Sequence, residues 1–328
     1  MVARFLLRRL LVMIPLLIGI TFIVFTVMAF VPGDPFAEMR LNPSFSPDTL
    51  AALEREFGFG QPLLVRYAKW LWQAVHLDLG LSVAYRVPVT ALLAMRAVNT
   101  LILAVTSIVL SWLLAIPIGI FVALRPRSAA DRVLSLAAFL GMSVPNFFFA
   151  FLLMYLALRT GWFPVGGTTS VGYDALGPGA KLLDRAHHLV LPVLVLGLSG
   201  MAGLMRLMRG QILAIRDADF VRTARAKGLP ERQVVWKHIL RNALNPFVTL
   251  AGYELGTLLS GAALVEAVMN LQGLGTLLLE AVRSLDVYLV MGAVLMGSVL
   301  LLLGNLLADL ALTAIDPRIG FARLEAAR

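Results

Sequence analysis

Three carboxylates lie inside long apolar stretches, where an ionisable side chain is costly and therefore suggests a function. Glu254 lies within residues 245–269, and it either lines a solute pathway or packs between helices. Glu266 lies near the end of the same stretch, where its side chain can reach water by snorkelling. Asn305 and Asp309 are four residues apart and share a helix face, which favours hydrogen bonding between helices.

Small residues recur within two of the apolar stretches. One stretch holds Gly197, Ser199, Gly200 and Gly203, and another holds Gly256, Ser260 and Gly261. Helices approach each other closely at such faces, so packing is the simpler interpretation. The alternative is a solute path between subunits, for which Ser199, Glu254, Ser260 and Gly261 are the candidate lining residues.

Residues for covalent chemistry do not form a recognisable set. The sequence contains no cysteine and no glycine-rich loop ending in Gly-Lys-Ser or Gly-Lys-Thr, so it has neither a thiol nucleophile nor this ATPase motif. His187 and His188 follow Asp184, but adjacent helical side chains point about 100° apart and no further ligand set accompanies them. We predict no catalytic residue, no metal site and no cofactor bound by this chain.

The most informative polar segment follows the fourth apolar stretch and is rich in Arg and Lys. Asp217 or Asp219 is suited to cap a short helix, and Gly228 supplies the left-handed residue that ends it. Pro230 then begins a second helix, which runs toward Arg241. The sequence predicts a compact helix-turn-helix between two apolar stretches.

The first of these short helices carries apolar side chains on an otherwise basic segment. Phe220, Val221 and Ala224 are available as a contact face for a partner. The simpler alternative is an ordinary solvated loop whose charge only sets the orientation in a membrane.

These elements must be positioned in a membrane. Hydrophobic residues make up 59% of the 328 residues and charged residues only 14%, which leaves too little polar surface for a water-soluble globule of this size. Apolar runs long enough to cross a bilayer recur along the chain. The six predicted spans are Leu10–Val31, Asn99–Leu124, Val133–Leu158, His188–Met208, Asn245–Met269 and Val287–Ile315.

The basic residues predict the orientation of these spans. The net charge is +9, but Lys and Arg gather at alternate ends of the spans: near residue 8, at residues 125–132 and over residues 206–241. This pattern places both termini and the basic segment in the cytoplasm, and it explains the charge without a nucleic-acid partner. The first apolar run is too long for a cleaved signal peptide, so we predict an uncleaved span that contacts lipid.

The segment between the first two spans carries no excess of positive charge and is predicted to lie outside. Ser46-Pro47-Asp48 is typical of a helix start, and Gly58 of a stop. A second amphipathic stretch, from Leu63 to Leu77, carries Tyr67, Trp70 and Trp72. Such aromatic side chains suit the boundary between water and lipid, so we expect this stretch at the outer membrane surface.

Several short motifs occur in an order that identifies a family. They are Val31-Pro32-Gly33-Asp34-Pro35, Phe57-Gly58, Gln61-Pro62, Asp78-Leu79-Gly80-Leu81-Ser82, Asp219 to Leu229, Gly273-Leu274-Gly275, Asn305 to Asp309 and Asp316-Pro317-Arg318. Together they resemble the dipeptide, oligopeptide and nickel branch of the binding-protein-dependent ABC transporter permeases, over nearly the whole chain. The chain departs from the family pattern at Arg222-Thr223-Ala224 in place of Glu-Ala-Ala, at Pro230 in place of Ser, and at Leu77 in place of Gly.

The resemblance implies an all-α polytopic protein with six transmembrane helices, the type I importer permease fold and a cytoplasmic coupling helix. The implied domains are residues 1–98 for the first span and outer segment, 99–319 for a five-helix core with the coupling loop at about 209–243, and 320–328 for a cytoplasmic tail. The implied ATPase-coupling residues are Asp219, Phe220, Val221, Arg222, Thr223, Ala224, Arg225, Ala226, Lys227 and Gly228.

The resemblance also implies partners and a location. They are a second homologous permease, two ABC ATPase subunits that bind ATP and Mg, and an extracytoplasmic solute-binding protein, all at the bacterial inner membrane. The expected cargo is a di- or oligopeptide, with nickel or another small solute as the alternative. An ion-coupled secondary transporter, in which Glu254 and Asp309 would carry protons, is the alternative of another class.

Overall fold

The computed structural model describes residues 2–34, 36–41, 46–56, 58, 60–247, 250, 254 and 263–315. Within these residues the regular structure is helical, apart from an isolated bridge between Leu81 and Pro88. The chain forms two compact units, which are described separately below. The first comprises residues 1–100 and 273–302, and the second comprises residues 101–272 and 303–328.

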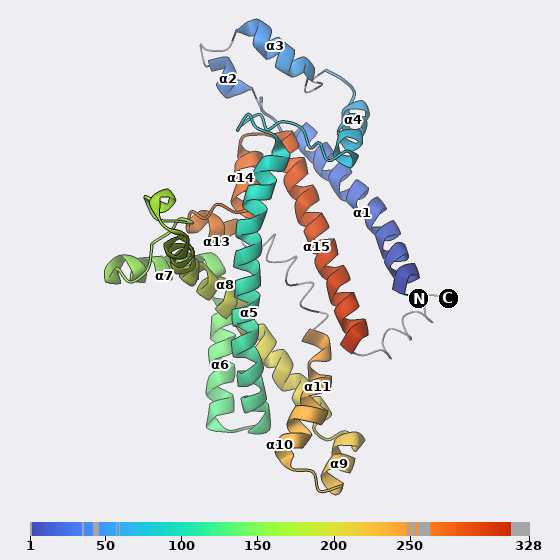
Figure 1. Cartoon of the computed structure of the whole chain (residues 1–328), viewed down its shortest axis with the longest axis vertical. Helices are drawn as coiled ribbons and strands as arrows, with labels where there is room; N and C mark the ends of the chain where they lie inside the picture. Colours follow the sequence, from blue (N-terminus) through green and yellow to red (C-terminus); the bar gives the residue numbers. More distant parts are fainter. Residues whose placement is uncertain are drawn as a thin grey trace. The chain divides into compact units, whose positions relative to one another are not determined.

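The helices of the first unit come from both ends of the sequence (Figure 1). They are α1 (Val2–Phe30), α2 (Ala37–Leu41), α3 (Pro47–Glu56), α4 (Leu63–Val75), the first turns of α5 (Val89–Leu124), α14 (Leu274–Arg283) and most of α15 (Val287–Ile315).

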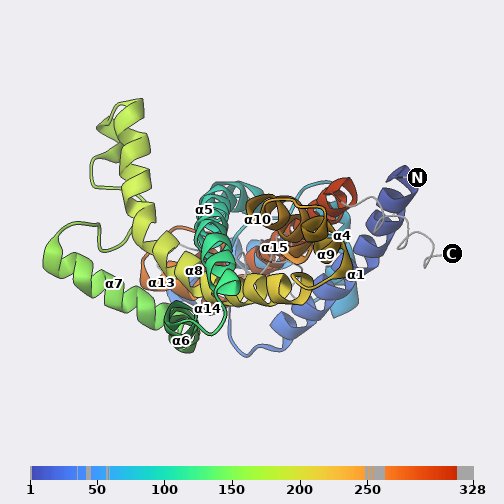
Figure 2. The same ribbon diagram turned by 90° about the horizontal axis from the view of Figure 1, so that it is seen from below.

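The second unit holds the rest of α5 and the elements that follow it. They are α6 (Ala129–Ser143), α7 (Asn146–Thr160), a 3₁₀ turn (Tyr173–Ala175), α8 (Pro178–Ile215), α9 (Asp219–Ala226), α10 (Glu231–Gln233), a π-helical turn (Val234–Ile239), α11 (Leu240–Ala243) and α13 (Ala263–Val268). Helix α7 contacts α8, and Figure 2 shows both helices from below.

Four described helices are long and apolar enough to cross a bilayer. They contain Arg9–Phe30, Val89–Leu124, Pro178–Ile215 and Val287–Leu310. These segments confirm helices at the predicted first, second, fourth and sixth spans. Three of the helices are longer than predicted, because α1 begins at Val2, α5 begins ten residues earlier, at Val89, and α8 runs from Pro178 to Ile215. Most of the predicted fifth span, Asn245–Met269, lies outside the described residues.

The third predicted span, Val133–Leu158, is not one continuous helix. Helices α6 and α7 meet at an angle of 99° and qualify only together, as a broken span or a re-entrant loop. Val144 and Pro145 both have extended backbone angles. Proline lacks an N–H and disfavours the helical conformation of the residue before it, so the helix stops here. The sequence analysis predicted a single span over these residues and not a break of this size.

In the first unit, α4 packs against the middle of α1. Tyr67 donates a hydrogen bond from Oη to the carbonyl of Ile18 at 2.9 Å, and its ring meets Phe22 edge to face at 5.2 Å between centroids. Ile18 precedes the end of α1 at Phe30 by about 18 Å along the helix axis. Trp70 is 1% exposed. The predicted amphipathic stretch is therefore a helix that lies against the first span rather than beyond its end.

The end of α4 uses an unusual residue. Leu77 adopts a left-handed conformation with φ of 64°. Its side chain is 82% exposed, so burial of the side chain does not offset the cost of this conformation. This conformation costs an ordinary L-residue about 1–2 kcal/mol, and glycine adopts it freely. The turn therefore forms as it would with glycine, despite the substitution noted in the sequence.

Candidate functional site: the basic loop and its supporting helices

The segment from Arg216 to Ala243, called the basic loop below, begins with the short helix α9. The N-cap is Ala218, which makes no side-chain cap, and Asp219 is the first helical residue. The expectation that Asp217 or Asp219 caps this helix through its side chain is therefore wrong. Asp219 instead places its charge in the first turn, where a carboxylate interacts favourably with the helix dipole.

The predicted end of α9 and start of the second helix are confirmed. Gly228 follows the helix with φ of 74°, the left-handed conformation that favours glycine. Pro230 is the N-cap of α10, and α10, the π-helical turn and α11 continue without a break from Glu231 to Ala243. The π-helical turn was not predicted; such turns occur often at functional sites.

The apolar face of α9 is mostly internal. Val221 is fully buried and Ala224 is 5% exposed, and both belong to one buried apolar cluster that includes Val234 and Val235 of the following turn. Phe220 remains 46% exposed. The predicted contact face of three residues is therefore reduced to Phe220, and the other two hold the loop together.

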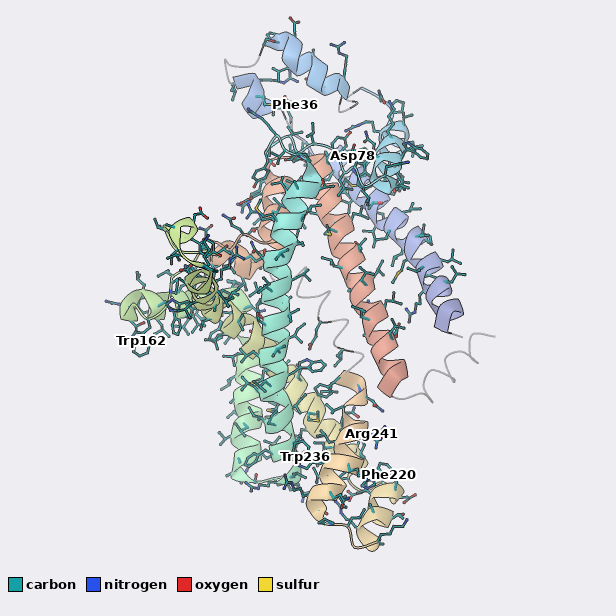
Figure 3. The ribbon with its side chains drawn as sticks, viewed as in Figure 1. Phe36, Asp78, Trp162, Phe220, Trp236 and Arg241 are labelled. Atoms are coloured by element: carbon teal, nitrogen blue, oxygen red, sulfur yellow. The ribbon has the colours of Figure 1, made fainter. Side chains whose placement is uncertain are left out.

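A second aromatic side chain lies outside this core. Trp236, on the π-helical turn, is 59% exposed (Figure 3). The basic loop also exposes Arg222, Lys227, Arg232, Lys237 and Arg241. An apolar core beneath exposed aromatic and basic side chains is suited to contact another protein.

An ion pair closes the turn between the two helices of the basic loop. Arg225 donates from Nη2 and Nε to the two carboxylate oxygens of Glu231, at 2.8 and 3.1 Å. The hydrogen bond from the guanidinium lowers the pKa of Glu231 below its ordinary value. Arg225 also donates from Nη1 to the carbonyl of Arg216 at 3.0 Å, which ties α9 to the end of α8.

Helix α8 is joined to α6 by a buried ion pair that the sequence analysis missed. Arg209 donates from Nε and Nη2 to the two carboxylate oxygens of Asp131, at 2.8 and 2.9 Å, and Asp131 is 4% exposed. The sequence did contain two signals. Ser128 and Asp131 have the spacing of a helix start, and Arg209 lies within a largely apolar helix.

The small residues of the fourth span pack against α5. A Cβ atom at Gly197 would lie 2.9 Å from the Leu110 side chain, and one at Gly200 would lie 3.1 Å from Ser111 Oγ. Ser111 also donates to the Gly197 carbonyl at 2.6 Å. Ser199 donates to the carbonyl of Val195 in its own helix, at 2.7 Å. At Gly197 and Gly200, the structure therefore supports the packing interpretation.

Of the candidate pathway residues, Glu254 contacts a distant part of the sequence. Its carboxylate accepts a hydrogen bond from Trp112 Nε1 on α5 at 2.9 Å, and Trp112 meets Phe247 edge to face. Ser260 and Gly261 lie outside the described residues.

The two adjacent histidines make contacts with the backbone. His187 and His188 form hydrogen bonds with the carbonyls of Trp162 and Asp184, and the described residues contain no cluster suited to a metal ion.

The long apolar helices and the compact basic loop together define a polytopic helical membrane protein. Residues 115–321 match the family model described as binding-protein-dependent transport system inner membrane component, and residues 1–84 match the model of its N-terminal part. The chain belongs to this family of transport permeases.

Individual relatives match over almost their whole length. The oligopeptide transport system permease protein AppB of Bacillus subtilis is 37% identical over 321 residues, covering 97% of this chain and 100% of the relative. A putative peptide permease protein of Brucella ovis is 39% identical over 319 residues, covering 96% and 98%. The dipeptide transport system permease protein DppB of Escherichia coli K12 is 34% identical over 333 residues, with the same coverage.

Proposed function

We propose that this chain forms part of the translocation pathway of an ATP-driven importer for di- or oligopeptides. The support is its family membership together with the similarity to relatives named as oligopeptide and dipeptide permeases. The chain itself performs no covalent step. Two partner ATPases bind ATP and Mg, a second homologous permease completes the pathway, and a solute-binding protein delivers the cargo from outside.

The proposal includes a topology. Six helices cross the inner membrane, the fifth over residues 245–269, and both termini and the basic loop are cytoplasmic. Residues 1–98 form the first span and outer segment, 99–319 the core and 320–328 a tail. The excess of Lys and Arg in the basic loop supports the orientation. The matches of the two family models to residues 1–84 and 115–321 support the division.

The observation that carries the coupling role is the construction of the basic loop. Val221 and Ala224 form an internal core, so α9 keeps its orientation without a partner, while Phe220 and Trp236 remain exposed. Exposed aromatic side chains on a rigid element are frequent anchors at protein interfaces. Asp219 to Gly228 are therefore the proposed contact with the ATPases, with Phe220 as the anchor.

The experiment that tests this role compares Phe220→Ala with Trp162→Ala in the detergent-purified complex. Trp162 is 74% exposed and lies outside the basic loop, so it is a matched exposed aromatic residue. Loss of an interface aromatic often costs about 2 kcal/mol of binding, which is roughly a thirtyfold weaker association. We expect Phe220→Ala to reduce the ATPase subunits retained per permease and Trp162→Ala to leave them unchanged. Equal retention in both variants would remove the coupling role.

The orientation has its own test. The chain contains no cysteine, so a cysteine introduced in place of Ala226 is the single thiol that a reagent can label in this chain. A thiol reagent that cannot cross membranes should leave it unlabelled in intact cells and label it in inverted vesicles. Labelling from outside would reverse the proposed topology.

Transport assays separate the alternatives of substrate and energy source. Peptide uptake into proteoliposomes should require ATP and the binding protein, and competing nickel chelates should not reduce it. Uptake driven by a proton gradient alone would instead favour a secondary transporter.

We also propose that Glu254 lines the pathway. Glu254→Gln should then change the rate of uptake or the peptide preference while the complex assembles normally. Unchanged uptake of every peptide would leave Glu254 with its packing contact to Trp112.

A further inference from the structure

The buried ion pair between α6 and α8 has no part in the function proposed so far. Asp131 lies in the first turn of α6, and Arg209 lies 78 residues later, on α8. The guanidinium contacts both carboxylate oxygens, a geometry that fixes the orientation of the pair as well as its distance. Asp131 is 4% exposed, whereas the Arg209 side chain is 32% exposed.

The same carboxylate organises the turn between α5 and α6. It accepts the backbone N–H of Arg127 at 2.9 Å and the hydroxyl of Ser135 at 3.3 Å. The N–H of Asp131 in turn donates to Ser128 Oγ at 3.1 Å, which caps α6. Arg127 has φ of 65°, a conformation that an arginine holds only where its surroundings impose it. Asp131 therefore fixes both the turn and its attachment to α8.

A second arginine of α8 contacts α6 further along. The guanidinium carbon of Arg206 lies 4.8 Å from the centroid of the Phe139 ring. Arg206 and Arg209 are three residues apart and share one face of α8. Two contacts, one ionic and one with an aromatic ring, therefore join the helices at two levels.

A few residues beyond Arg209, the C-terminal end of α8 leads directly into the basic loop. The helix continues from Arg209 to Ile215, and the carbonyl of Arg216 accepts a hydrogen bond from Arg225 of α9 at 3.0 Å. A displacement of α9 therefore reaches Arg209 through about two helical turns and one hydrogen bond.

We propose that the Asp131–Arg209 pair makes α6 and α8 move as one body when the basic loop is displaced during transport. Packed apolar helices can slide past each other by small shear motions. Here a slide would pull the guanidinium from a buried carboxylate, which cannot replace it with water at low cost. Both residues are positioning residues, and their role rests on the proposed coupling function of the basic loop.

The first test measures the distance between α6 and α8 in the intact transporter. Cysteines introduced at Leu136 on α6 and Ala214 on α8, both exposed, carry spin labels in an otherwise cysteine-free permease. The distance between the labels should agree within about 2 Å in the nucleotide-free complex and in the complex trapped with ATP and vanadate. A clear change of the distance between the labels, with Asp131 and Arg209 both in place, would overturn the proposal.

The second test removes the pair. Asp131→Asn and Arg209→Gln should each reduce uptake about tenfold while ATP hydrolysis continues and the ATPases stay bound. The double variant has two neutral amides, which leave no buried charge unpaired, so uptake should recover to within about threefold of the unmodified protein. Asp34→Asn is the matched control, because Asp34 pairs with Arg40 at 2.7 Å outside the basic loop and its side chain is 40% exposed.

The outcomes separate this proposal from the function on which it rests. If the unmodified chain retains no ATPases, the coupling function fails. If the complex transports but the single variants lose uptake only in proportion to lost protein, and the double variant recovers nothing, the pair is a folding contact and the proposal fails. If the single variants do not assemble, the distance measurement in the unmodified complex still decides.

Discussion

Helices α4 and α9 are both short, and each buries one face and exposes an aromatic residue on another. On α4 the buried residues include Tyr67 and Trp70, and Trp72 is 69% exposed. On α9 the buried residues are Val221 and Ala224, and Phe220 is 46% exposed. By sequence pattern alone, the two helices are alike.

Their surroundings differ. The exposed side of α4 is largely apolar: Leu64 and Val65 are 66% and 43% exposed and, with Ala68, Lys69 and Trp72, line a shallow hollow. The exposed side of α9 carries Arg222 and Arg225, and the exposed Lys227 follows directly after the helix. Helix α4 also packs against the long apolar helix α1, whereas α9 belongs to a buried cluster that the basic loop shares with α5, α6 and α8.

This difference in exposed side chains indicates which surroundings each helix contacts. Since Tyr67 reaches a level of α1 well within the span, the apolar side of α4 is expected to face lipid. The basic side of α9 is expected to face water and a protein partner. Four predictions test whether the two helices face different surroundings.

The largest effect is expected from a charge in the core of the basic loop. Val221→Asp would place an unpaired carboxylate at a fully buried position, which costs about 3–5 kcal/mol. We expect protease cleavage within residues 216–243 and loss of the ATPases. Val221→Ile, which keeps the position apolar, should remain protected. Resistance of Val221→Asp to protease would show that the loop does not depend on this core.

The same substitution at two exposed alanines tests what each helix faces. Ala68→Asp on α4 should lower the stability of the permease in bilayers by about 2–3 kcal/mol, because a carboxylate is poorly tolerated against lipid. Ala226→Asp on α9 should change it by no more than about 1 kcal/mol, as expected at a hydrated surface. Denaturation in lipid bicelles measures both. Equal effects would mean that the two helices face the same kind of surroundings.

The residues in left-handed conformation after α9 and α4 allow opposite tests: glycine can be replaced at Gly228 and introduced at Leu77. Gly228→Val should cost about 1–2 kcal/mol because of its left-handed conformation, although a Cβ there would meet no atom within 4 Å. Gly228→Asn is the matched control, because asparagine tolerates this conformation. Leu77→Gly should relieve the same strain at the end of α4. Thermal unfolding of the purified protein gives the order: Leu77→Gly at or above the unmodified chain, and Gly228→Val below Gly228→Asn.

The smallest effect is expected from the Arg225–Glu231 pair. The guanidinium lowers the pKa of Glu231 below its ordinary value of 4.5, so the pair stabilises the loop above that pH and loses its effect as pH falls through the lowered value. The two side chains are 38% and 59% exposed, so the contribution is about 0.5 kcal/mol. Glu231→Gln should therefore melt slightly lower at pH 7 but equally once the pH is below the lowered pKa of Glu231. A difference that persists in acid would point to packing rather than charge.

Local chemistry explains what could be predicted. Long apolar runs gave helices α1, α5, α8 and α15, because the length and hydropathy of a span are properties of one continuous segment. Gly228 and Pro230 correctly predicted the end of α9 and the start of the next helix, because glycine readily adopts the left-handed conformation and proline fixes φ. The prediction of a side-chain cap by Asp217 or Asp219 failed, because capping also depends on the orientation of the preceding turn.

The sequence alone thus predicted four long apolar helices, the family, and the end of α9 at Gly228. Only the tertiary structure decided that Val221 faces inward, that α4 lies against α1, and that Arg209 reaches Asp131. The amphipathic pattern of α9 marks an apolar face but does not say whether the chain itself or a partner covers it. The Asp131–Arg209 contact joins residues 78 positions apart, so it follows from how α6 and α8 pack and not from the propensity of either segment.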